Sequence, residues 1–596
     1  MPISKASVGL TALVVALFGA GLPALGQQKP ESILPPGFDQ PPASTSTPRP
    51  TPTHATPAPV APSSTPAVPV PSGVAPTPAV PVAVPTPAAT GLPTPAAASV
   101  GSASRYVLPA ASRRSLAMIG ISLADPMVDP RAFGGADGRY IEELMRRTRV
   151  PIASRWVSIS LRRLLAQPLA TPTHINGADF AAERAWLLLR MGESVVGRAI
   201  VQSVDVQDYT PKLYQIAMQA ALATADIGAM CPLANDAVTV SPEPGWVLAR
   251  AMCAGLSSAQ GQQAPLMNQA KRVASGIDLL LAQKIAGKGT NRQEVTIEWA
   301  SVSNLNIWRY GLATAAGEDI PDQLFDGLGA QIRYWQVLSP RLDPIKRSQF
   351  AQAAAARGVL SNAALVDLYG LIDSGDEQNT AANAVATDLK TAYAAPTRDA
   401  RLDALRGLWR EANGGELALY GRLVLTARAA ARIQVAPKTD GSDELIASMF
   451  SAGMDRSASQ WKPAVKRGSL GWALIALGSP DDKSHYSSND VGALSINGAK
   501  QKMFAAGLAG LGRLDPAVAQ SYDVDVSGAN SWTRAIDQAA AHGRPGEVVI
   551  LAGVGMQTPV WRGVSPQALF HIVNALRVVG LGGMARMVAA EAVTRV

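Results

Sequence analysis

The sequence predicts an all-α protein: an α-solenoid-like array of antiparallel helix hairpins, preceded by a signal peptide and a disordered Pro/Ala/Thr-rich linker. Three observations support this prediction. From residue 179 onward, apolar residues recur at helical spacing in segments of roughly 12 to 18 residues. Breaks of only a few residues separate these segments, which makes neighbouring helices antiparallel. Alternation of apolar and polar residues over strand lengths is almost absent.

The first 26 residues have the composition of a secretory signal peptide. Lys5 supplies a positive charge, an apolar run covers residues 8–22, and Ala24 and Gly26 place small residues before a cleavage site. The run is shorter than the roughly 20 residues that span a bilayer, so cleavage is favoured over an uncleaved anchor. We expect a mature chain that starts at Gln27, has no membrane span, and is periplasmic or secreted.

Residues 27–104 have the composition of a disordered linker. Of the 45 prolines, 21 lie between residues 30 and 95, and no Asp, Glu, Lys or Arg occurs between Arg49 and Arg105. Such a segment buries too little apolar surface to offset its ordering entropy, and its prolines favour extended polyproline II. The Thr-Pro-Ala composition superficially resembles antifreeze glycopeptide precursors, without their strict Ala-Ala-Thr period.

One short stretch of the linker, residues 31–40, contains large apolar side chains. A cluster of this kind beside a spacer is typical of a short docking motif, and disordered chain with a few hydrophobic residues is the alternative. The candidate partner-binding residues are Ile33, Leu34, Pro35, Pro36 and Phe38.

Arginine is concentrated at the start of the predicted folded body. Between Arg105 and Arg163 the chain has eleven arginines and five acidic residues, so this segment holds most of the net charge of +8. One interpretation is attraction to an anionic envelope surface. The other is solvated arginines on two helices, one capped by Asp137 and one starting at Pro151. Charged residues make up 16% and aromatic residues 5% of the chain, too few for a nucleic-acid interface.

The body continues as predicted helices joined by short breaks. Thr210 followed by Pro211 is typical of a helix start, and Gly228 stands where a C-cap belongs. The helices are expected at residues 179–190, 211–226, 244–256, 268–286, 302–316, 321–337, 345–357, 361–372, 397–413 and 416–433.

A break at residues 435–441 starts a C-terminal region. Helices are expected at 499–514, 532–542 and 547–557, although residues 548–551 also fit a buried strand. The chain closes with a helix from Ser565 to about Gly580 and a returning helix to Val596. We expect this hairpin to be a solvent-facing terminal cap, with outward charges at Arg577, Arg586, Glu591 and Arg595.

The only two cysteines are 22 residues apart, near the start of one predicted helix and the end of the next. Antiparallel neighbours bring such ends together, and an oxidising compartment favours their pairing. We therefore predict a disulfide between Cys231 and Cys253, with two buried free thiols as the alternative.

Catalytic and metal-binding patterns are weak. The five histidines are scattered without metal-ligand spacing. Ser459 and Lys462 match the S-x-x-K of penicillin-binding proteins, and Ser487 with Asn489 matches S-x-N, but the Lys-Thr/Ser-Gly element that should follow is missing. The Glu-Ser pair of lytic transglycosylases occurs in the body only at Glu193-Ser194, too early in the chain for that domain.

The Ala-rich helix pairs of residues 179–433 resemble tetratricopeptide and Sel1-type repeats, and with the leader they resemble exported helical repeat proteins of Gram-negative bacteria. The resemblance implies a concave binding face. We divide the chain into a signal peptide (1–26), a linker (27–104), a helical repeat domain (105–434) and a C-terminal helical domain (435–596). We expect an exported non-catalytic scaffold that binds other envelope proteins, without a cofactor. The alternative is a peptidoglycan-processing enzyme similar to lytic transglycosylases.

Overall fold

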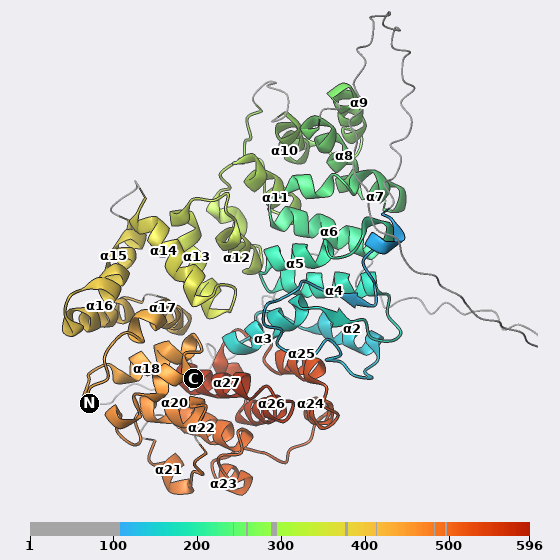
Figure 1. Ribbon diagram of the computed structural model, residues 1–596. Coiled ribbons are helices and arrows are strands. Elements are labelled where there is room, and N and C mark those ends of the chain that lie inside the picture. The colour runs from blue at the N-terminus through green and yellow to red at the C-terminus, as the bar shows by residue number, and fades with distance from the viewer. Residues whose placement is uncertain are drawn as a thin grey trace, which may run out of the picture. The chain divides into compact units, whose positions relative to one another are not determined.

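The computed structural model describes residues 108–596 apart from 242, 258–259, 288–294, 376–379, 413, 482 and 495–497. Over these residues the chain is all-α, as the sequence predicts, and successive helices pack on their neighbours (Figure 1). The described strands are β1 (Met118–Ile119) and β2 (Leu169–Ala170), which form an antiparallel pair. The signal peptide, the linker and the motif at Ile33 to Phe38 lie outside the described residues.

The first run of helices follows the chain from α2 to α11. Helix α4 packs on α5 and α6, α6 on α11, and α10 on both α8 and α11. The bounds are α2 (Gly138–Arg147), α3 (Arg155–Ala166), α4 (Gly177–Arg190), α5 (Ser194–Val201), α6 (Pro211–Ala223), α7 (Ala234–Val240), α8 (Pro244–Leu256), α9 (Gln260–Ala270), α10 (Gly276–Gly287) and α11 (Ile307–Ala316), with the 3-10 helices η1 (Ala110–Ser112), η2 (Val206–Asp208) and η3 (Ile227–Met230).

A second run packs each helix on the next, and its last helix, α17, returns to α13 and α14. Its members are η4 (Asp322–Phe325), α12 (Gln331–Leu338), α13 (Pro344–Ala356), α14 (Asn362–Asp373), α15 (Ala381–Ala394), α16 (Arg398–Arg410) and α17 (Gly415–Ala430). The indole Nε1 of Trp335 in α12 donates to the Leu189 carbonyl of α4 at 3.1 Å, which joins this run to the first.

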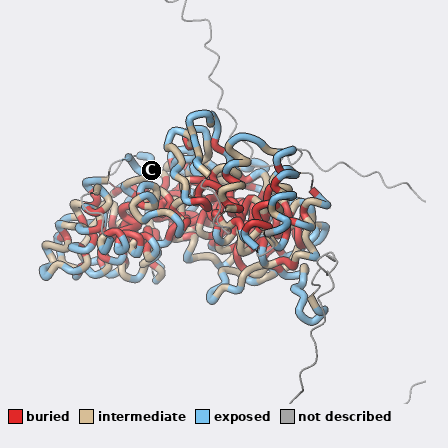
Figure 2. Tube along the Cα trace, turned by 90° about the horizontal axis from the view of Figure 1, so that it is seen from above, coloured by how far each residue is buried: buried red, intermediate tan, exposed pale blue. Residues whose placement is uncertain are grey.

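The third run surrounds the C-terminal helix, which packs on α18, α20, α22 and α26. Its members are α18 (Ser442–Ser451), α19 (Asp455–Ser459), η5 (Lys462–Ala464), α20 (Leu470–Gly478), α21 (Ser488–Gly492), α22 (Gly498–Gly510), α23 (Pro516–Gln520), α24 (Ser531–Ala541), α25 (Pro545–Gly555), η6 (Trp561–Gly563), α26 (Pro566–Val578) and α27 (Gly582–Arg595). Buried residues form the interior of the folded body, and exposed residues lie on its outside (Figure 2).

Capping residues explain where many helices begin. Thr210, Ser361, Thr397 and Ser565 each accept a hydrogen bond from the backbone N–H three residues on. This bond satisfies one of the free donors at a helix N-terminus. The starts that the sequence predicts at these four residues are therefore confirmed.

Several predicted bounds are wrong for local reasons. Helix α3 does not start at Pro151, because Ser154 caps it by accepting from Val157 N. Helix α6 ends at Ala223, not near Gly228, since Ala225 adopts a positive φ of 51° and turns the chain. The helix predicted at 268–286 is two helices, α9 and α10, with Gly276 at φ 59° directly at the start of the second.

Helix α3 connects the beginning and the end of the described chain. It packs against α4 and α5 from the first run and against α25 and α27 from the third. Its N-terminus faces the carboxylate of Glu591 in α27, which accepts from Ser154 Oγ at 2.6 Å and from Arg155 N at 2.8 Å. Residues more than 400 positions apart therefore share one core.

A buried charge cluster, formed by Arg155, Glu591 and Arg595, surrounds that contact, and Glu416 pairs with it from an exposed position on α17. Arg595 Nη1 lies 2.6 Å from Glu591 Oε1, and Arg595 Nε pairs with Glu416 of α17. Arg155 donates to the backbone oxygens of Ser451 and Leu360 at 3.1 and 3.0 Å. Burial lowers the pKa of Arg155, yet its carbonyl partners keep the guanidinium hydrogen-bonded.

This cluster corrects the prediction of a solvent-facing terminal cap. Glu591 and Arg595 are 2% and 5% exposed, so two of the four charges expected outward are at the centre of the packing. The reason is reciprocal pairing: Glu591 and Arg595 are counter-ions at i,i+4 on the same helix. Glu591 also accepts from the start of α3, and Arg595 pairs with Glu416 of α17 and donates to the Ala153 carbonyl. A buried charge is tolerated when it is paired and hydrogen-bonded in this way.

The disulfide is as predicted. Cys231, directly after η3, and Cys253 in α8 are bonded, with their Cα atoms 5.4 Å apart. The bond closes the hairpin of α7 and α8, which also packs on η3. None of the described helices is both long and apolar enough to cross a bilayer.

Candidate functional site

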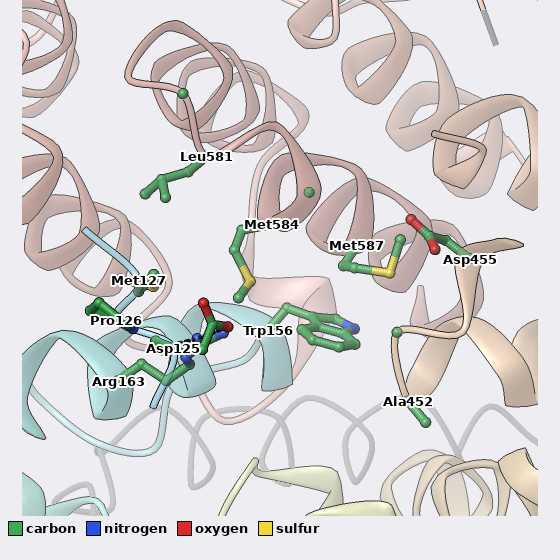
Figure 3. Close-up of a pocket in the computed structure, with 13 residues that line it drawn as sticks. Asp125, Pro126, Met127, Trp156, Arg163, Ala452, Asp455, Leu581, Met584 and Met587 are labelled. Carbon is green, nitrogen blue, oxygen red and sulfur yellow. Dashed lines mark hydrogen bonds and ion pairs between the residues drawn. The ribbon is translucent and has the colours of Figure 1, made fainter. Parts of the chain in front are cut away.

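An open groove of about 460 Å³ lies where α3, α19 and the turn between α26 and α27 meet (Figure 3). We call it the methionine groove. Three methionines and one tryptophan are among its lining residues. The lining residues are Asp125, Pro126, Met127, Trp156, Arg163, Ala452, Gly453, Asp455, Gly580, Leu581, Gly583, Met584 and Met587.

One wall of the groove is a loop that Gln167 holds in place. The Gln167 side chain, directly after α3, accepts from Met127 N at 3.0 Å and donates to the Val128 carbonyl at 2.8 Å. Gln167 is itself fixed, since its carbonyl accepts from the buried guanidinium of Arg184 at 2.6 Å. Burial lowers the pKa of Arg184 to about 9, and its guanidinium donates to the backbone carbonyls of Ile119, Leu165 and Gln167.

Trp156 connects the groove with the buried charge cluster. Its backbone N–H donates to Glu591 Oε2 at 3.2 Å, while its indole ring lies between Met584 and Met587 in Figure 3. Gly453 lies against the same ring: a Cβ at this position would approach the indole to 2.9 Å, and Gly453 has a φ of 75°. The Trp156 side chain is therefore positioned by the same contact that joins α3 to α27.

Met584 and Met587 project from the first turns of α27. The turn before them contains Gly580 at φ 83°, and Leu581 occupies the N-cap position without a side-chain cap. Met587 is buried and Met584 half-buried. Unbranched thioether side chains adapt their shape to what they contact, and methionine is over-used at protein surfaces that bind varied apolar partners.

Every charged side chain that lines the groove has an ion-pair partner. Arg163 Nη2 lies 2.9 Å from Asp125 Oδ2, and Arg586 Nη2 lies 2.9 Å from Asp455 Oδ2. Arg586 also donates to the Gly478 carbonyl at 3.2 Å. The rim of the groove thus carries no uncompensated charge.

The two aspartates do not form a catalytic carboxylate pair. They lie at opposite ends of the groove, with Trp156 and Met584 between them (Figure 3). Glycoside hydrolysis needs two carboxyl groups that flank one bond, one of them held protonated in apolar surroundings. Here each carboxylate is paired with an arginine at the solvent-facing rim.

The other candidate catalytic residues have structural contacts. Ser459 Oγ donates to the Asp455 carbonyl of its own helix at 2.7 Å, and Ser487 forms a capping box with Asp490. Glu193 caps α5 and lies 3.6 Å from Arg162; burial raises its pKa. Glu547 is buried and pairs with Arg544 at 3.2 Å. Within the described residues, no three His, Cys, Asp or Glu side chains gather as a metal site.

Many of the arginines predicted to face an anionic surface take part in the fold. Arg155 and Arg162 are buried, and four others pair with carboxylates: Arg114, Arg146, Arg147 and Arg163. Arg105 lies outside the described residues. The same holds for the candidate docking residues Ile33, Leu34, Pro35, Pro36 and Phe38.

Comparisons with protein-family models, with curated proteins and with solved structures find no match to this chain.

Sequence reasoning missed the methionine groove. Its residues come from positions 125–163, 452–455 and 580–587, which no local pattern connects. The one available signal is the spacing of Met584 and Met587, three residues apart directly after two glycines, at the start of a helix. Two large flexible side chains at a helix start that has no side-chain cap indicate that this end of the helix lies partly at the protein surface.

Proposed function

We propose that this chain is an exported, non-catalytic helical scaffold, periplasmic or secreted, that binds other proteins of the cell envelope. The methionine groove is its principal contact surface in this proposal. The motif at Ile33 to Phe38 and the exposed arginines of the segment from Arg105 to Arg163 are secondary candidates.

The observation that carries the proposal is the composition of the groove. The groove is an open concavity in which Met127 and Met584 are partly exposed, while Trp156 and Met587 form its buried floor. Open concavities on helical proteins are typical of sites that receive a segment of another protein. The signal peptide that the sequence predicts at residues 1–26 supports export, and the disulfide between Cys231 and Cys253 is compatible with an oxidising compartment.

The competing proposal, a peptidoglycan-processing enzyme, has no comparable support. It needs an acid and a base, or a nucleophile with its base, next to one reacting bond. The described carboxylates nearest to a cavity are paired with arginines and lie at opposite ends of the groove.

A pull-down from envelope extracts tests the proposal. The mature chain from Gln27 is compared with a version that lacks residues 27–104. We expect proteins to be captured in stoichiometric amounts by both, because the groove lies in the folded body. Loss on truncation would place the contact in the linker. Capture of peptidoglycan alone, shortened during incubation, would contradict the scaffold.

A further inference from the structure

We infer that the segment around Phe38, which lies outside the described residues, docks in a small apolar pocket of the folded body. The pocket lies among α5, η2, α6 and η3, and we call it the alanine pocket. The inference goes beyond the proposed function, because it concerns a contact of the chain with its own body and holds whether or not that body binds other proteins.

The alanine pocket has room for one large apolar side chain. Its volume is about 200 Å³, and an apolar cavity of about 150 Å³ binds benzene. The space exists because small side chains line it, in a protein interior that is otherwise close-packed. Six of its apolar lining residues are Val206, Tyr209, Ala217, Ala221, Ala229 and Leu233.

The surface that this pocket offers to a ligand is mainly apolar. Val206, Tyr209 and Ala229 are half-buried, so part of each is in contact with water. The Tyr209 hydroxyl donates to the Val201 carbonyl at 3.0 Å, so this polar group already has a partner. An aromatic or branched aliphatic side chain that enters the pocket removes the remaining apolar surface from water.

Arginines contribute to the lining of the same pocket. Arg114 is paired with Asp205 at 2.7 Å, and Arg198 is paired with Asp226 at 2.5 Å. Arg113 is also within electrostatic range of Asp205, so two arginines share one carboxylate. The Arg114 side chain is 53% exposed. A carboxylate beside the incoming side chain is therefore attracted here, and a basic group is repelled.

The sequence of segment 31–40 matches this pocket. Phe38 is the only phenylalanine of residues 27–104, and Asp39 follows it directly. Glu31 and Asp39 are the only acidic residues of the same range. An aromatic ring with an adjacent carboxylate therefore occurs once in this part of the sequence, and it complements an apolar pocket beside arginines.

The segment is attached close to the pocket. The described chain begins at Leu108, a few positions before Arg114, and about 70 residues separate Phe38 from Leu108. A flexible chain of about 70 residues has a root-mean-square span of about 45 Å, so Phe38 can reach the pocket of its own body. Because both are on one chain, docking is intramolecular and favoured by a high effective concentration. The docked segment keeps the apolar motif from Ile33 to Phe38 away from other partners.

The test measures hydrogen exchange in the full mature chain, with Phe38→Ala as the variant. The matched control is Leu92→Ala, since Leu92 has no acidic neighbour. We expect the amides of residues 201–217 and 227–233 to exchange at least about threefold faster in Phe38→Ala, because the pocket loses its ligand. Leu92→Ala should match wild type. An excess of a synthetic peptide of residues 31–40 should restore protection in Phe38→Ala, and the peptide with Phe38→Ala should not.

A variant of the pocket completes the design. Ala229→Leu fills the alanine pocket from its half-buried lining, and its control is Ala274→Leu, at a half-buried alanine that does not line the pocket. In combination with Phe38→Ala, Ala229→Leu should abolish the effect of the peptide and Ala274→Leu should preserve it. If Ala229→Leu fails to fold, the two peptides added to Phe38→Ala still decide.

Three results would overturn the inference. Equal exchange in wild type, Phe38→Ala and Leu92→Ala would show that Phe38 does not occupy the pocket. Protection restored equally by both peptides would show that the ring is not what docks. Protection in wild type that rises with protein concentration would assign the pocket to the segment of a second copy and not to that of the same chain.

Discussion

The carboxylate of Glu591 is the most connected polar group of the contact between α3 and α27. It accepts from five donors: Ser154 Oγ, Arg155 N, Trp156 N, Trp561 Nε1 and Arg595 Nη1. Three of these donors lie at the N-terminus of α3, where the helix presents unpaired N–H groups and a partial positive charge. The side chain of Glu591 thus caps a helix that begins 436 residues earlier.

We predict that Glu591→Gln destabilises the protein by about 3 to 5 kcal/mol, the cost of removing one partner from a buried ion pair. The amide also turns one acceptor oxygen into a donor that faces other donors. The free energy of unfolding from urea titration measures the effect. The control is Glu444→Gln on the exposed face of α18, which should change stability by less than about 0.5 kcal/mol. Equal effects of the two variants would contradict the role of Glu591.

A second residue-scale prediction concerns Asp205, which holds the start of the described chain. Its side chain is 1% exposed and accepts from Arg114 N at 2.8 Å and Arg114 Nε at 2.7 Å. Desolvation opposes ionisation, but these hydrogen bonds outweigh it, so the pKa of Asp205 is lowered from its ordinary value of 3.8. The ionised side chain therefore stabilises the folded state above about pH 3.8, and this contribution is lost as the pH falls through the lowered pKa.

Asp205→Asn should therefore cost about 1 to 2 kcal/mol at pH 7, a value discounted because Arg114 is half exposed. The difference from wild type should shrink as the pH falls below about 3.8, where the unfolded chain takes up the proton first, and should vanish below the lowered pKa of Asp205 in the folded protein. Hydrogen exchange of residues 112–118, with variant and wild type compared at each pH, measures it. A difference that stays constant down to pH 3 would show that charge is not the cause.

At the scale of helices, the sequence predicts where a helix begins better than it predicts which helices pack on each other. Starts at Thr210, Ser361, Thr397 and Ser565 could be predicted because a capping side chain bonds its own backbone. Helix α15 and the helices α18 to α21 were not predicted. Segment 435–497 is rich in Gly, Ser and Asp, and its helices depend on packing, such as that of α18 on α17 and α20. The strand alternative at 548–551 is wrong, because α25 includes these residues.

Close helix packing depends on single glycines. At Gly421 of α17 a Cβ would lie 2.6 Å from the Gln352 carbonyl oxygen of α13. Gly421→Ala should therefore cost about 1 to 3 kcal/mol, because backbone atoms must separate. The matched control is Gly407→Ala in α16, where a Cβ meets nothing within 4 Å; it should stabilise by up to about 1 kcal/mol. The melting temperatures of the two variants measure these effects. A shift of the same sign in both would contradict this interpretation of the packing.

The disulfide belongs to the same scale. Replacing both Cys231 and Cys253 by serine should destabilise the hairpin of α7 and α8 by roughly 3 kcal/mol, since the bond closes a loop of 22 residues. Faster hydrogen exchange over residues 227–241 and 243–256 is the expected readout. Reductant should reproduce the effect in wild type and add nothing in the double variant. Unchanged exchange in both cases would show that helix packing alone holds the hairpin.

At the scale of the whole molecule, the all-α class could be predicted from periodicity, but the contact between α3 and α27 could not. Ser154 and Glu591 are 437 residues apart, and no pattern in either segment points to the other. For the same reason the methionine groove, which draws on three distant segments, is invisible in the sequence. Outward charges on the last hairpin were a reasonable expectation from local pattern, and the buried partners of Glu591 and Arg595 overturn it.

We propose that the folded body binds other proteins and that the methionine groove is where it does so. Photo-cross-linking tests it most directly, with p-benzoylphenylalanine placed at position 583 and, as a control, at position 582 of the full chain in intact cells. We expect a discrete adduct with a second, different polypeptide from position 583 and little or none from position 582. Absence of any protein adduct at position 583, together with peptidoglycan turnover by the purified chain, would contradict it.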